Sequence, residues 1–341
     1  MKILYAVQAT GNGHIGRARV MAAALKKYDI EVDWVFSGRP AAQYFDMQVF
    51  GNYKTYNGLS FIIENHKLNI LKSMFSAKLL QFYKDIKSID FSQYDLLIND
   101  FEPVTAWAAK LSKFKSIGLS HQSAFLYKIP FVKRNFIFNL SMKHYAPTSQ
   151  PIGIHWQQFD EHILPPIIAP NTNKITSSNN EILVYIPFHS TSEIIELLRG
   201  FKKYNFHIFH ADTAEAKYDH LHFHAFSRDG FAKYMARCDG IISNAGFELP
   251  SEALQMGKKL LIEPLQNQIE QISNANTLDQ LDWSQTEDKI NTQNIEKWLL
   301  KNIPKQVTWP DVAGELVAWI KQGKLNTLPE LSQKLWAKVE M

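Results

Sequence analysis

The sequence predicts an α/β protein built from two doubly wound parallel-sheet domains. Short apolar segments alternate with helical patterns through the first half of the chain, as in successive β-α-β units. A tract rich in proline, asparagine, serine and threonine interrupts this pattern over residues 146–181, and the alternation then restarts. We therefore expect a boundary at residues 170–180, with domains over residues 1–170 and 171–315. The last helices, over residues 316–341, are expected to pack back on the first domain.

In the first half, strands and helices are expected in turn. The expected strands are KILYAVQA (2–9), EVDWVFSG (31–38), YDLLIND (94–100) and KSIGLSH (115–121). One helix is expected to open near His14, a long one to lie within residues 67–88, and another to span TAWAAKLSKF. Short apolar runs bounded by polar turns are typical of strands buried on both faces.

In the second half, the expected strands cover residues 181–189, 206–211, 221–226, 239–246 and 259–264. Helical patterns lie between them, another starts near Gln268, and two more close the chain. Open parallel sheets bind ligands at the carboxyl ends of their strands. Two such domains therefore predict a site in a cleft between the two carboxyl edges.

The composition is that of an ordinary soluble globular protein. The chain has 341 residues, 45% of them hydrophobic and 21% charged, which is too long for one compact core. Its single cysteine, Cys238, excludes a disulfide framework and fits a reducing compartment. The opening MKILYAVQA leads into glycines and is interpreted as a strand rather than a signal peptide. We expect a cytoplasmic protein.

The charge is spread unevenly along the chain. Residues 1–170 hold 19 Lys/Arg against 12 Asp/Glu, whereas residues 171–341 hold 18 against 21. A basic first half favours an anionic partner such as lipid or an anionic acceptor, although chance variation between domains explains it equally well. No nucleic-acid recognition motif accompanies the charge, so no nucleic-acid partner is expected.

The first loop contains Gly11-x-Gly13-x-x-Gly16, the spacing of a dinucleotide-binding fingerprint. Such a site also needs an acid at the end of the second strand to hold the ribose. Here Asp33 lies in mid-strand, and Arg39 after the strand would suit only a 2′-phosphate. A dehydrogenase is therefore disfavoured, and the loop is interpreted as a turn that presents a histidine.

A second constellation occupies residues 241–275. A strand ends at Asn244-Ala245-Gly246, and a helix begins near Phe247, so that free N–H groups form an anion site suited to a diphosphate. Glu252 follows on that helix, where its carboxylate could accept both hydroxyls of a ribose.

After the next strand, Glu270 and Gln271 are expected again at the sheet edge. A carboxylate beside an amide can accept and donate to two adjacent sugar hydroxyls. A nucleotide-sugar pocket needs three parts in this order: a phosphate site, a carboxylate for the ribose, and a pair of groups for the sugar hydroxyls.

This order of motifs resembles the donor site of GT-B glycosyltransferases, in the branch that holds the peptidoglycan N-acetylglucosaminyltransferase, the UDP-glucuronosyltransferases and a related microbial group. The resemblance implies that Glu252 holds the ribose, that Glu270 and Gln271 hold the donor sugar, and that Ala245 and Gly246 bind the diphosphate. The family often has His-Gly-Gly at the turn, whereas this chain has Asn-Ala-Gly, which changes the side chain at the diphosphate.

The resemblance extends to the first domain. The family's Gly-x-Gly-His matches residues 11–14, and the resemblance implies that His14 is the general base for the acceptor hydroxyl. SHQSA, with His121 and Gln122, resembles a turn that lines the acceptor side, and NDFEP resembles an acidic segment of the microbial group. Asp100, which ends a strand at the same edge, is expected to orient His14, to hold the acceptor, or to cap a helix.

The resulting prediction is a GT-B enzyme that transfers a sugar, with inversion, from a UDP-linked donor to a hydroxyl of a glycan or glycolipid. It needs no cofactor and no metal. The alternatives are a UDP-sugar epimerase of the same fold and a catalytically silent nucleotide-sugar-binding protein. An epimerase would release a changed sugar nucleotide without an acceptor, whereas a silent protein would bind the donor without turnover.

Several further residues have a functional and a structural interpretation. Ser190 could meet the diphosphate or form a capping box with Glu193, and Phe226 could wall the base pocket or lie in the core. Five histidines between residues 207 and 224 suggest a metal patch, but His220, His222 and His224 alternate and are interpreted as one strand face.

The basic aromatic stretch over residues 125–145 suits an anionic membrane surface, unless its apolar side chains pack inward.

Overall fold

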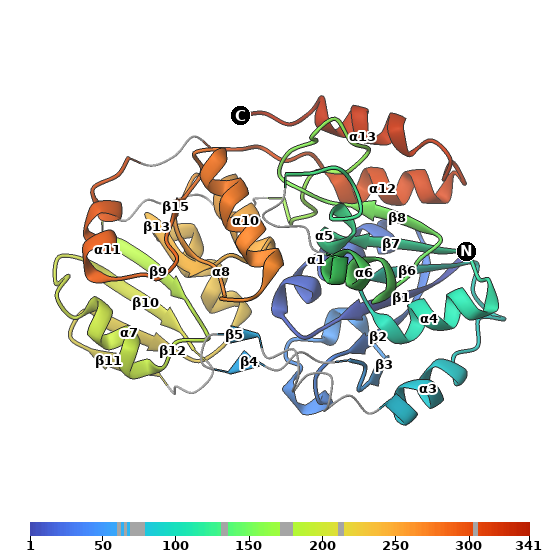
Figure 1. Cartoon of the computed structure of the whole chain (residues 1–341), viewed down its shortest axis with the longest axis horizontal. Coiled ribbons are helices and arrows are strands. Elements are labelled where there is room, and N and C mark those ends of the chain that lie inside the picture. The colour runs from blue at the N-terminus through green and yellow to red at the C-terminus, as the bar shows by residue number, and fades with distance from the viewer. Residues whose placement is uncertain are drawn as a thin grey trace. The chain divides into compact units, whose positions relative to one another are not determined.

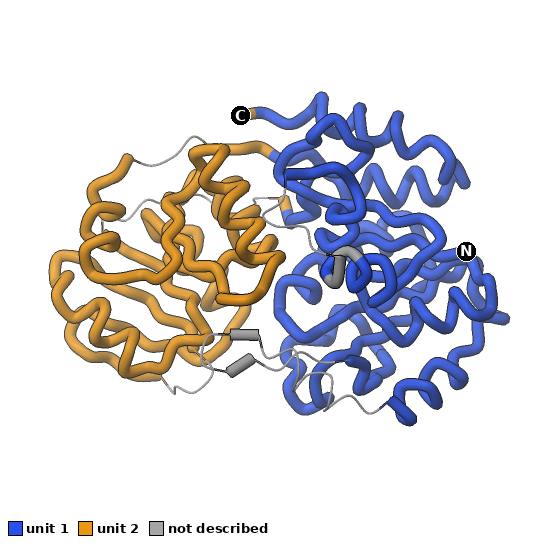
Figure 2. Tube along the Cα trace, in the orientation of Figure 1, with its two compact units in different colours: residues 1–62, 69–169, 309–340 blue, residues 63–68, 170–308, 341 orange. Residues whose placement is uncertain are grey.

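The computed structural model describes residues 1–59, 63–64, 67–68, 79–130, 136–170, 180–210, 215–302 and 306–341. The chain divides into two compact units (Figure 2). Unit 1 comprises Met1–Ile62, Asn69–Ala169 and Trp309–Glu340, and unit 2 comprises Ile63–Leu68, Pro170–Thr308 and Met341. The chain leaves unit 1 after Ala169, within the proline-rich tract, and it returns at Trp309 rather than at residue 316.

Unit 1 contains a six-stranded parallel sheet with the order β3-β2-β1-β6-β7-β8 (Figure 1). Its strands are β1 (Lys2–Gln8), β2 (Glu31–Ser37), β3 (Tyr53–Tyr56), β6 (Leu96–Asp100), β7 (Ser116–Ser120) and β8 (Gln150–Gly153). The order reverses between β1 and β6, where Val7 lies opposite Asp100. In a doubly wound sheet this reversal opens the crevice in which ligands bind.

Helices cover the sheet of unit 1. They are α1 (Asn12–Lys27), α3 (Leu79–Lys87), α4 (Pro103–Ser112), α5 (His121–Ala124), α6 (Phe136–His144), α12 (Val312–Lys321) and α13 (Leu328–Trp336), with short 3-10 turns at Ala41–Gln43 and Gln48–Phe50. The C-terminal helices are tied to the unit by hydrogen bonds: Lys321 donates to the Tyr28 carbonyl, and Ser332 and Trp336 donate to the Ile163 carbonyl.

Unit 2 contains a seven-stranded sheet with the order β11-β12-β10-β9-β13-β14-β15, in which all pairs are parallel except that β11 is antiparallel to β12. Its strands are β9 (Glu181–Tyr185), β10 (Asn205–Phe209), β11 (Ala216–Tyr218), β12 (Leu221–His224), β13 (Gly240–Asn244), β14 (Lys259–Glu263) and β15 (Gln285–Thr286). Its helices are α7 (Thr191–Leu198), α8 (Arg228–Arg237), α9 (Glu248–Gln255), α10 (Ile269–Gln280) and α11 (Thr292–Leu299). The strand order reverses between β9 and β13.

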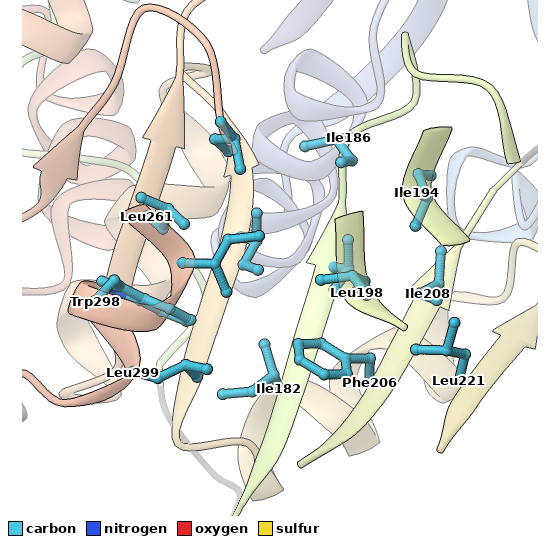
Figure 3. Close-up of a cluster of buried hydrophobic side chains, with 14 of the residues drawn as sticks. Ile182, Ile186, Ile194, Leu198, Phe206, Ile208, Leu221, Leu261, Trp298 and Leu299 are labelled. Atoms are coloured by element: carbon cyan, nitrogen blue, oxygen red, sulfur yellow. The ribbon is translucent and has the colours of Figure 1, made fainter. Parts of the chain in front are cut away.

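The core of unit 2 explains why its strands are almost continuously apolar. Ile182, Phe206 and Leu221 come from three neighbouring strands and pack with Leu198 of α7 and Trp298 of α11 (Figure 3). All five side chains are buried, and burying a large apolar side chain stabilises a fold by roughly 1.5–3 kcal/mol. This packing holds the carboxyl ends of the strands in register, so the loops that follow them are fixed at one edge.

The prediction of two doubly wound parallel sheets is confirmed, with some differences in detail. The helix expected within residues 67–88 is α3 (Leu79–Lys87), whereas Lys67–Leu68 (β5) pairs with Ile63–Glu64 (β4); residues 69–78 lie outside the described residues. The proline-rich tract contains strand β8, and three helices close the chain instead of two. In the described ranges, no helix is both long and apolar enough to cross a membrane.

Candidate active site

The loop after β1 delivers His14 to the point where the sheet of unit 1 reverses. Gly11 is the extended N-cap of α1, so His14 lies in the first turn of that helix. A methyl group added at Gly11 would meet no heavy atom of the described chain within 4 Å, and Gly13 follows within the same turn. The space in front of this helix end is therefore open, and His14 stands beside it with 15% of its side chain exposed.

His14 forms a network with two buried charged residues. Its Nδ1 lies 2.7 Å from Oδ1 of Asp100, the last residue of β6. Arg17, one turn along α1, donates from Nε to Oδ2 of Asp100 at 2.9 Å and from Nη2 to Oδ1 at 2.7 Å. Asp100 and Arg17 are 0% and 2% exposed. The carboxylate therefore orients the imidazole, and the guanidinium fixes the carboxylate in a two-pronged contact.

This geometry keeps Asp100 ionised. Burial alone would raise the pKa of Asp100, but Arg17 and His14 beside it lower the pKa below its usual value. Nη2 of Arg17 also lies 3.0 Å from Nδ1 of His14, and because a guanidinium can only donate, this contact is a hydrogen bond only in the tautomer whose Nδ1 carries no hydrogen. In the other tautomer, Nδ1 carries the hydrogen and donates it to Oδ1 of Asp100, and Nη2 of Arg17 donates to Oδ1 alone. Nε2 of His14 is then left with a lone pair that can accept a proton.

The expected role of Asp100 as an orienting group matches this contact, whereas Arg17 was not anticipated from the sequence. The signal was present, because residues three apart on a helix lie on the same face and Arg17 follows His14 at this spacing. The other acid of the NDFEP segment, Glu102, is buried and caps α4 by accepting from the backbone N–H groups of Val104 and Thr105.

The two expected acceptor-side residues lie on α5, directly after β7. His121 is 1% exposed, and its Nδ1 lies 2.9 Å from the Ile154 carbonyl oxygen among the rings of Phe125, His155 and Trp156. It is thus packed in the core, out of contact with solvent. Gln122 lines a cavity of about 740 Å³ in unit 1, whose lining includes neither His14 nor Asp100.

The turn after β13 forms the corresponding feature of unit 2. Asn244 donates from Nδ2 to the Glu263 carbonyl oxygen at 2.9 Å, and Asn274 of α10 donates to the Ala245 carbonyl oxygen at 3.0 Å. Gly246 has a negative φ, and a methyl group added there would meet no heavy atom within 4 Å in the described parts of the chain. Neither the φ angle nor the packing therefore requires a glycine at position 246. Open space lies beside the backbone there, just before α9 begins.

Helix α9 starts without a side-chain cap, at Phe247. In the first turn, Pro250 carries no N–H and Ser251 donates to the Phe247 carbonyl oxygen at 3.2 Å. An anion attracted by the helix dipole would therefore meet the N–H groups that precede Pro250. Asn274 was not anticipated as a site residue; its fully buried amide holds the turn in place and so contributes to positioning.

Glu252 lies on α9 with its side chain partly buried. Burial raises the pKa of its carboxyl to about 7, and the Arg228 guanidinium only partly opposes this shift. In the described part of the chain, no hydrogen-bond donor contacts this carboxylate. A desolvated acid without a donor is suited to accept hydrogen bonds from a ligand.

The remaining donor-side candidates differ in the hydrogen bonds and packing contacts that their side chains make within the protein. Ser190 forms the complete capping box with Glu193 that was expected as its structural alternative. Gln271 accepts from the Leu265 N–H at 2.8 Å and is 8% exposed, so its carbonyl oxygen shapes the turn after β14. Glu270 is half-buried in the first turn of α10, and the ring of Phe226 packs 6.1 Å from that of Tyr185.

The histidines of unit 2 form an aromatic stack. His207 of β10 packs against His222 and His224 of β12, with Nδ1 of His207 3.1 Å from Nε2 of His224, and against Tyr234 of α8 at 3.9 Å. His220 instead bonds the Leu198 carbonyl oxygen, so only part of the expected alternation faces one side. Among the described residues, no group of three or more His, Cys, Asp or Glu is arranged to hold a metal ion.

This stack predicts a loss of stability in acid. Burial and the neighbouring imidazoles lower the pKa of His207 to about 3, far below its value of about 6.5 in an unfolded chain. Between these pH values the unfolded chain binds a proton that the folded chain does not, so the free energy of unfolding falls as the pH drops. His207→Phe should therefore show a smaller drop in urea midpoint between pH 7 and pH 4.5 than the parent protein.

The control for this measurement is His162→Phe, which removes an exposed histidine from unit 1. It should leave the drop unchanged. An identical pH dependence in the His207 variant would show that the stack does not control acid stability.

The two doubly wound units, each with a helix that begins at its strand-order reversal, define the GT-B fold class. Solved glycosyltransferases share it over nearly the whole chain. LpCGTa in complex with UDP has a TM-score of 0.61 at 14% identity, covering 98% of this chain and 99% of the other. UGT89C1 of Arabidopsis thaliana with UDP has a TM-score of 0.58 at 12% identity, covering 98% and 99%. MurG of Acinetobacter baumannii has a TM-score of 0.56 at 14% identity, covering 94% and 100%.

The chain belongs to glycosyl transferase family 1, whose family model matches residues 1–135 and 148–304. This match confirms the resemblance that the sequence motifs indicate. A comparison with curated proteins gives no match.

Proposed function

We propose that the protein transfers a sugar from a UDP-linked donor to a hydroxyl of a glycan or glycolipid, with inversion at the anomeric carbon. The observation that carries this proposal is the His14–Asp100–Arg17 network, which leaves Nε2 of His14 available as a base at the edge of the sheet. Membership of the glycosyl transferase family and the open turn at Gly246 support the same reaction.

In this proposal, His14 acts as the general base. Its Nε2 takes the proton of the acceptor hydroxyl while the hydroxyl oxygen forms a bond to the anomeric carbon. The bond from that carbon to the diphosphate oxygen breaks, and attack from the opposite face inverts the configuration. The imidazolium that results is stabilised by Asp100 at 2.7 Å from Nδ1.

The departing diphosphate carries the electron pair of the broken bond. We propose that the N–H groups at the start of α9, beside Gly246, hold it in place of a metal ion. Glu252 would accept hydrogen bonds from the ribose hydroxyls, and Glu270 and the amide nitrogen of Gln271 would contact the donor sugar. The assignment to UDP is supported by the solved UDP complexes of the same fold and requires its own test.

Thermal shifts with UDP-, GDP- and dTDP-sugars provide that test. A ligand that binds only the folded protein raises its melting temperature, by an amount that reflects its affinity. We expect the UDP-sugars to give the largest shift, and a larger shift from a GDP- or dTDP-sugar would refute the assignment of the nucleotide. If a changed free nucleotide sugar appears without an acceptor, the protein is an epimerase and not a transferase.

Donor binding should depend on pH through Glu252. Burial raises the pKa of its carboxyl to about 7, and the ionised carboxylate is a stronger acceptor for ribose hydroxyls than the neutral acid, so affinity should rise with pH. Roughly a tenth of these carboxyl groups are ionised at pH 6 in the free protein, so a UDP-sugar should bind more weakly at pH 6 than at pH 8, by up to about tenfold. A UDP-sugar is the right probe, because its diphosphate does not titrate in this range.

Calorimetry at the two pH values measures this effect, and Glu252→Gln is the matched variant. The variant should bind more weakly at pH 8 and lose the pH dependence. If its affinity still falls tenfold at pH 6, another group controls the titration.

A further inference from the structure

Arg17 contacts both members of the pair formed by His14 and Asp100. Its Nη2 lies 2.7 Å from Oδ1 of Asp100 and 3.0 Å from Nδ1 of His14, and its Nε donates to Oδ2 of Asp100 at 2.9 Å. His14 and Arg17 lie one turn apart on α1, whereas Asp100 reaches the same point from the end of β6. One helix and one strand thus bring the proposed base, an acid and a cation into mutual contact.

The shortest contact of His14 favours one of its two tautomers. Nδ1 lies 2.7 Å from Oδ1 of Asp100, and this carboxylate carries no hydrogen when it is ionised. If Nδ1 also carried none, two lone pairs would face each other at hydrogen-bond distance. If Nδ1 carries the hydrogen, Oδ1 accepts from Nδ1 and from Nη2 of Arg17, as a carboxylate oxygen can. We therefore expect the hydrogen on Nδ1 and a lone pair on Nε2.

The charge of Arg17 matters because a carboxylate without a cation would hold a proton on the imidazole. An opposite charge nearby favours the charged form of a titratable group, and a like charge disfavours it. Asp100 is 0% exposed and Arg17 is 2% exposed, so water and salt screen these charges little. The attraction of the carboxylate for an imidazolium is therefore offset by repulsion from the guanidinium.

The charged groups around His14 come from three elements of unit 1. In the described ranges, the side-chain hydrogen bonds and ion pairs of His14 and Asp100 join them to each other and to Arg17. Arg39, which follows β2, donates to Oδ1 of Asn12 in the first turn of α1. The balance of charge at the imidazole thus depends chiefly on the pair of Asp100 and Arg17.

We infer that Arg17 is a positioning residue for the proposed base: it fixes Asp100 as the acceptor of the Nδ1 hydrogen and offsets the carboxylate charge that would otherwise keep His14 protonated. The inference rests on the proposed function and adds a control on the pH range in which the base operates. Asp100 then orients the ring, and Arg17 keeps Nε2 free to take the acceptor proton.

The pH dependence of kcat/KM separates this charge effect from a purely structural role. Arg17→Gln keeps a donor for Asp100 but removes the charge, so the carboxylate is left to hold a proton on His14. The acidic limb of the profile, where the rate falls as the pH drops, should therefore move to higher pH by about 1–2 units. Arg17→Lys keeps the charge and should leave the limb in place, although one ammonium lacks the planar fork and the rate should fall. Equal rate losses at every pH in both variants, with an unmoved limb, would overturn the inference.

Arg19→Gln is the matched control. It removes a positive charge from the same helix, but Arg19 donates to the Phe45 carbonyl oxygen at 3.1 Å and makes no contact with Asp100. The limb should stay in place in this variant. A shift as large as that of Arg17→Gln would show a general effect of the charge on α1 and refute the specific contact.

Nitrogen-15 NMR of histidine-labelled protein tests the same inference without turnover. The signals of His14, one of 12 histidines, are assigned by their loss in His14→Gln. In the parent protein at pH 8 we expect the hydrogen on Nδ1 and not on Nε2. The midpoint of the His14 titration should rise in Arg17→Gln and stay in place in Arg17→Lys. A hydrogen on Nε2, or an unmoved midpoint in Arg17→Gln, would overturn the inference; the tautomer needs no Arg17 variant and decides the case if Arg17→Gln does not fold.

The two measurements also separate this inference from the proposed function. If the parent protein transfers no sugar from any sugar nucleotide, the proposed function fails, while NMR still decides whether Arg17 controls the proton on His14. If the parent transfers sugar and neither limb nor midpoint moves in Arg17→Gln, the inference fails and the proposed function stands.

Discussion

Replacing His14 by alanine should reduce turnover by about 10²- to 10⁴-fold, the usual contribution of a positioned general base. The imidazole is the group whose Nε2 is left to accept a proton once Nδ1 donates to Asp100. Donor binding should stay close to that of the parent protein, because the groups assigned to the donor belong to unit 2. Initial rates with a UDP-sugar and a glycan or glycolipid acceptor, together with calorimetry of the donor, measure both quantities.

His162→Ala removes an exposed histidine of the same unit and should leave the rate unchanged. A His14 variant that retains full turnover while losing donor binding would exclude the role of base.

Asp100→Asn should lower the free energy of unfolding by about 3–5 kcal/mol, because it leaves the charge of Arg17 buried without its partner. Arg17 is 2% exposed and directs two hydrogen bonds to this carboxylate. Arg17→Met should destabilise the protein for the converse reason. The double variant should be more stable than the sum of the two single effects predicts, since neither charge then remains buried alone.

Urea unfolding of the four proteins of this cycle measures the coupling. Additive losses would show that the pair is not coupled. The double variant should still have low turnover even if its stability recovers, because no carboxylate then orients His14.

Much of the fold could be predicted from the sequence because parallel strands that are buried on both faces are nearly continuous apolar runs. The apolar runs at residues 2–9, 94–100 and 239–246 correspond to strands β1, β6 and β13. The order of these strands in the two sheets is that of a doubly wound fold. Short edge elements were not predicted: β11 has three residues and β15 two, too few to show a period. Strand β8 was hidden in the proline-rich tract, because an edge strand tolerates proline.

The candidate site was predictable where the residue type itself carries the chemistry. His14, Asp100 and Glu252 are titratable side chains next to predicted strand ends or helix starts, so their position could be inferred. Arg17 and Asn274 act through contacts across the fold, over 83 and 29 residues of sequence. The spacing from His14 places Arg17 on the same helix face, but no local pattern reveals that its partner is Asp100. His121 shows the opposite error, since a polar residue at a strand end can also be buried in the core.

The donor site can be tested most directly by titrating UDP into Gly246→Val. A Cβ atom added at Gly246 meets no described atom of the protein within 4 Å, chain neighbours aside, and the φ of Gly246 is not positive, so the variant should fold normally. It should nevertheless block a diphosphate that approaches the start of α9. Gly200→Val, at another open glycine of unit 2, is the matched control. We predict that UDP binds the parent protein and the Gly200 variant but not the Gly246 variant; unchanged UDP affinity in a folded Gly246→Val protein would contradict the account.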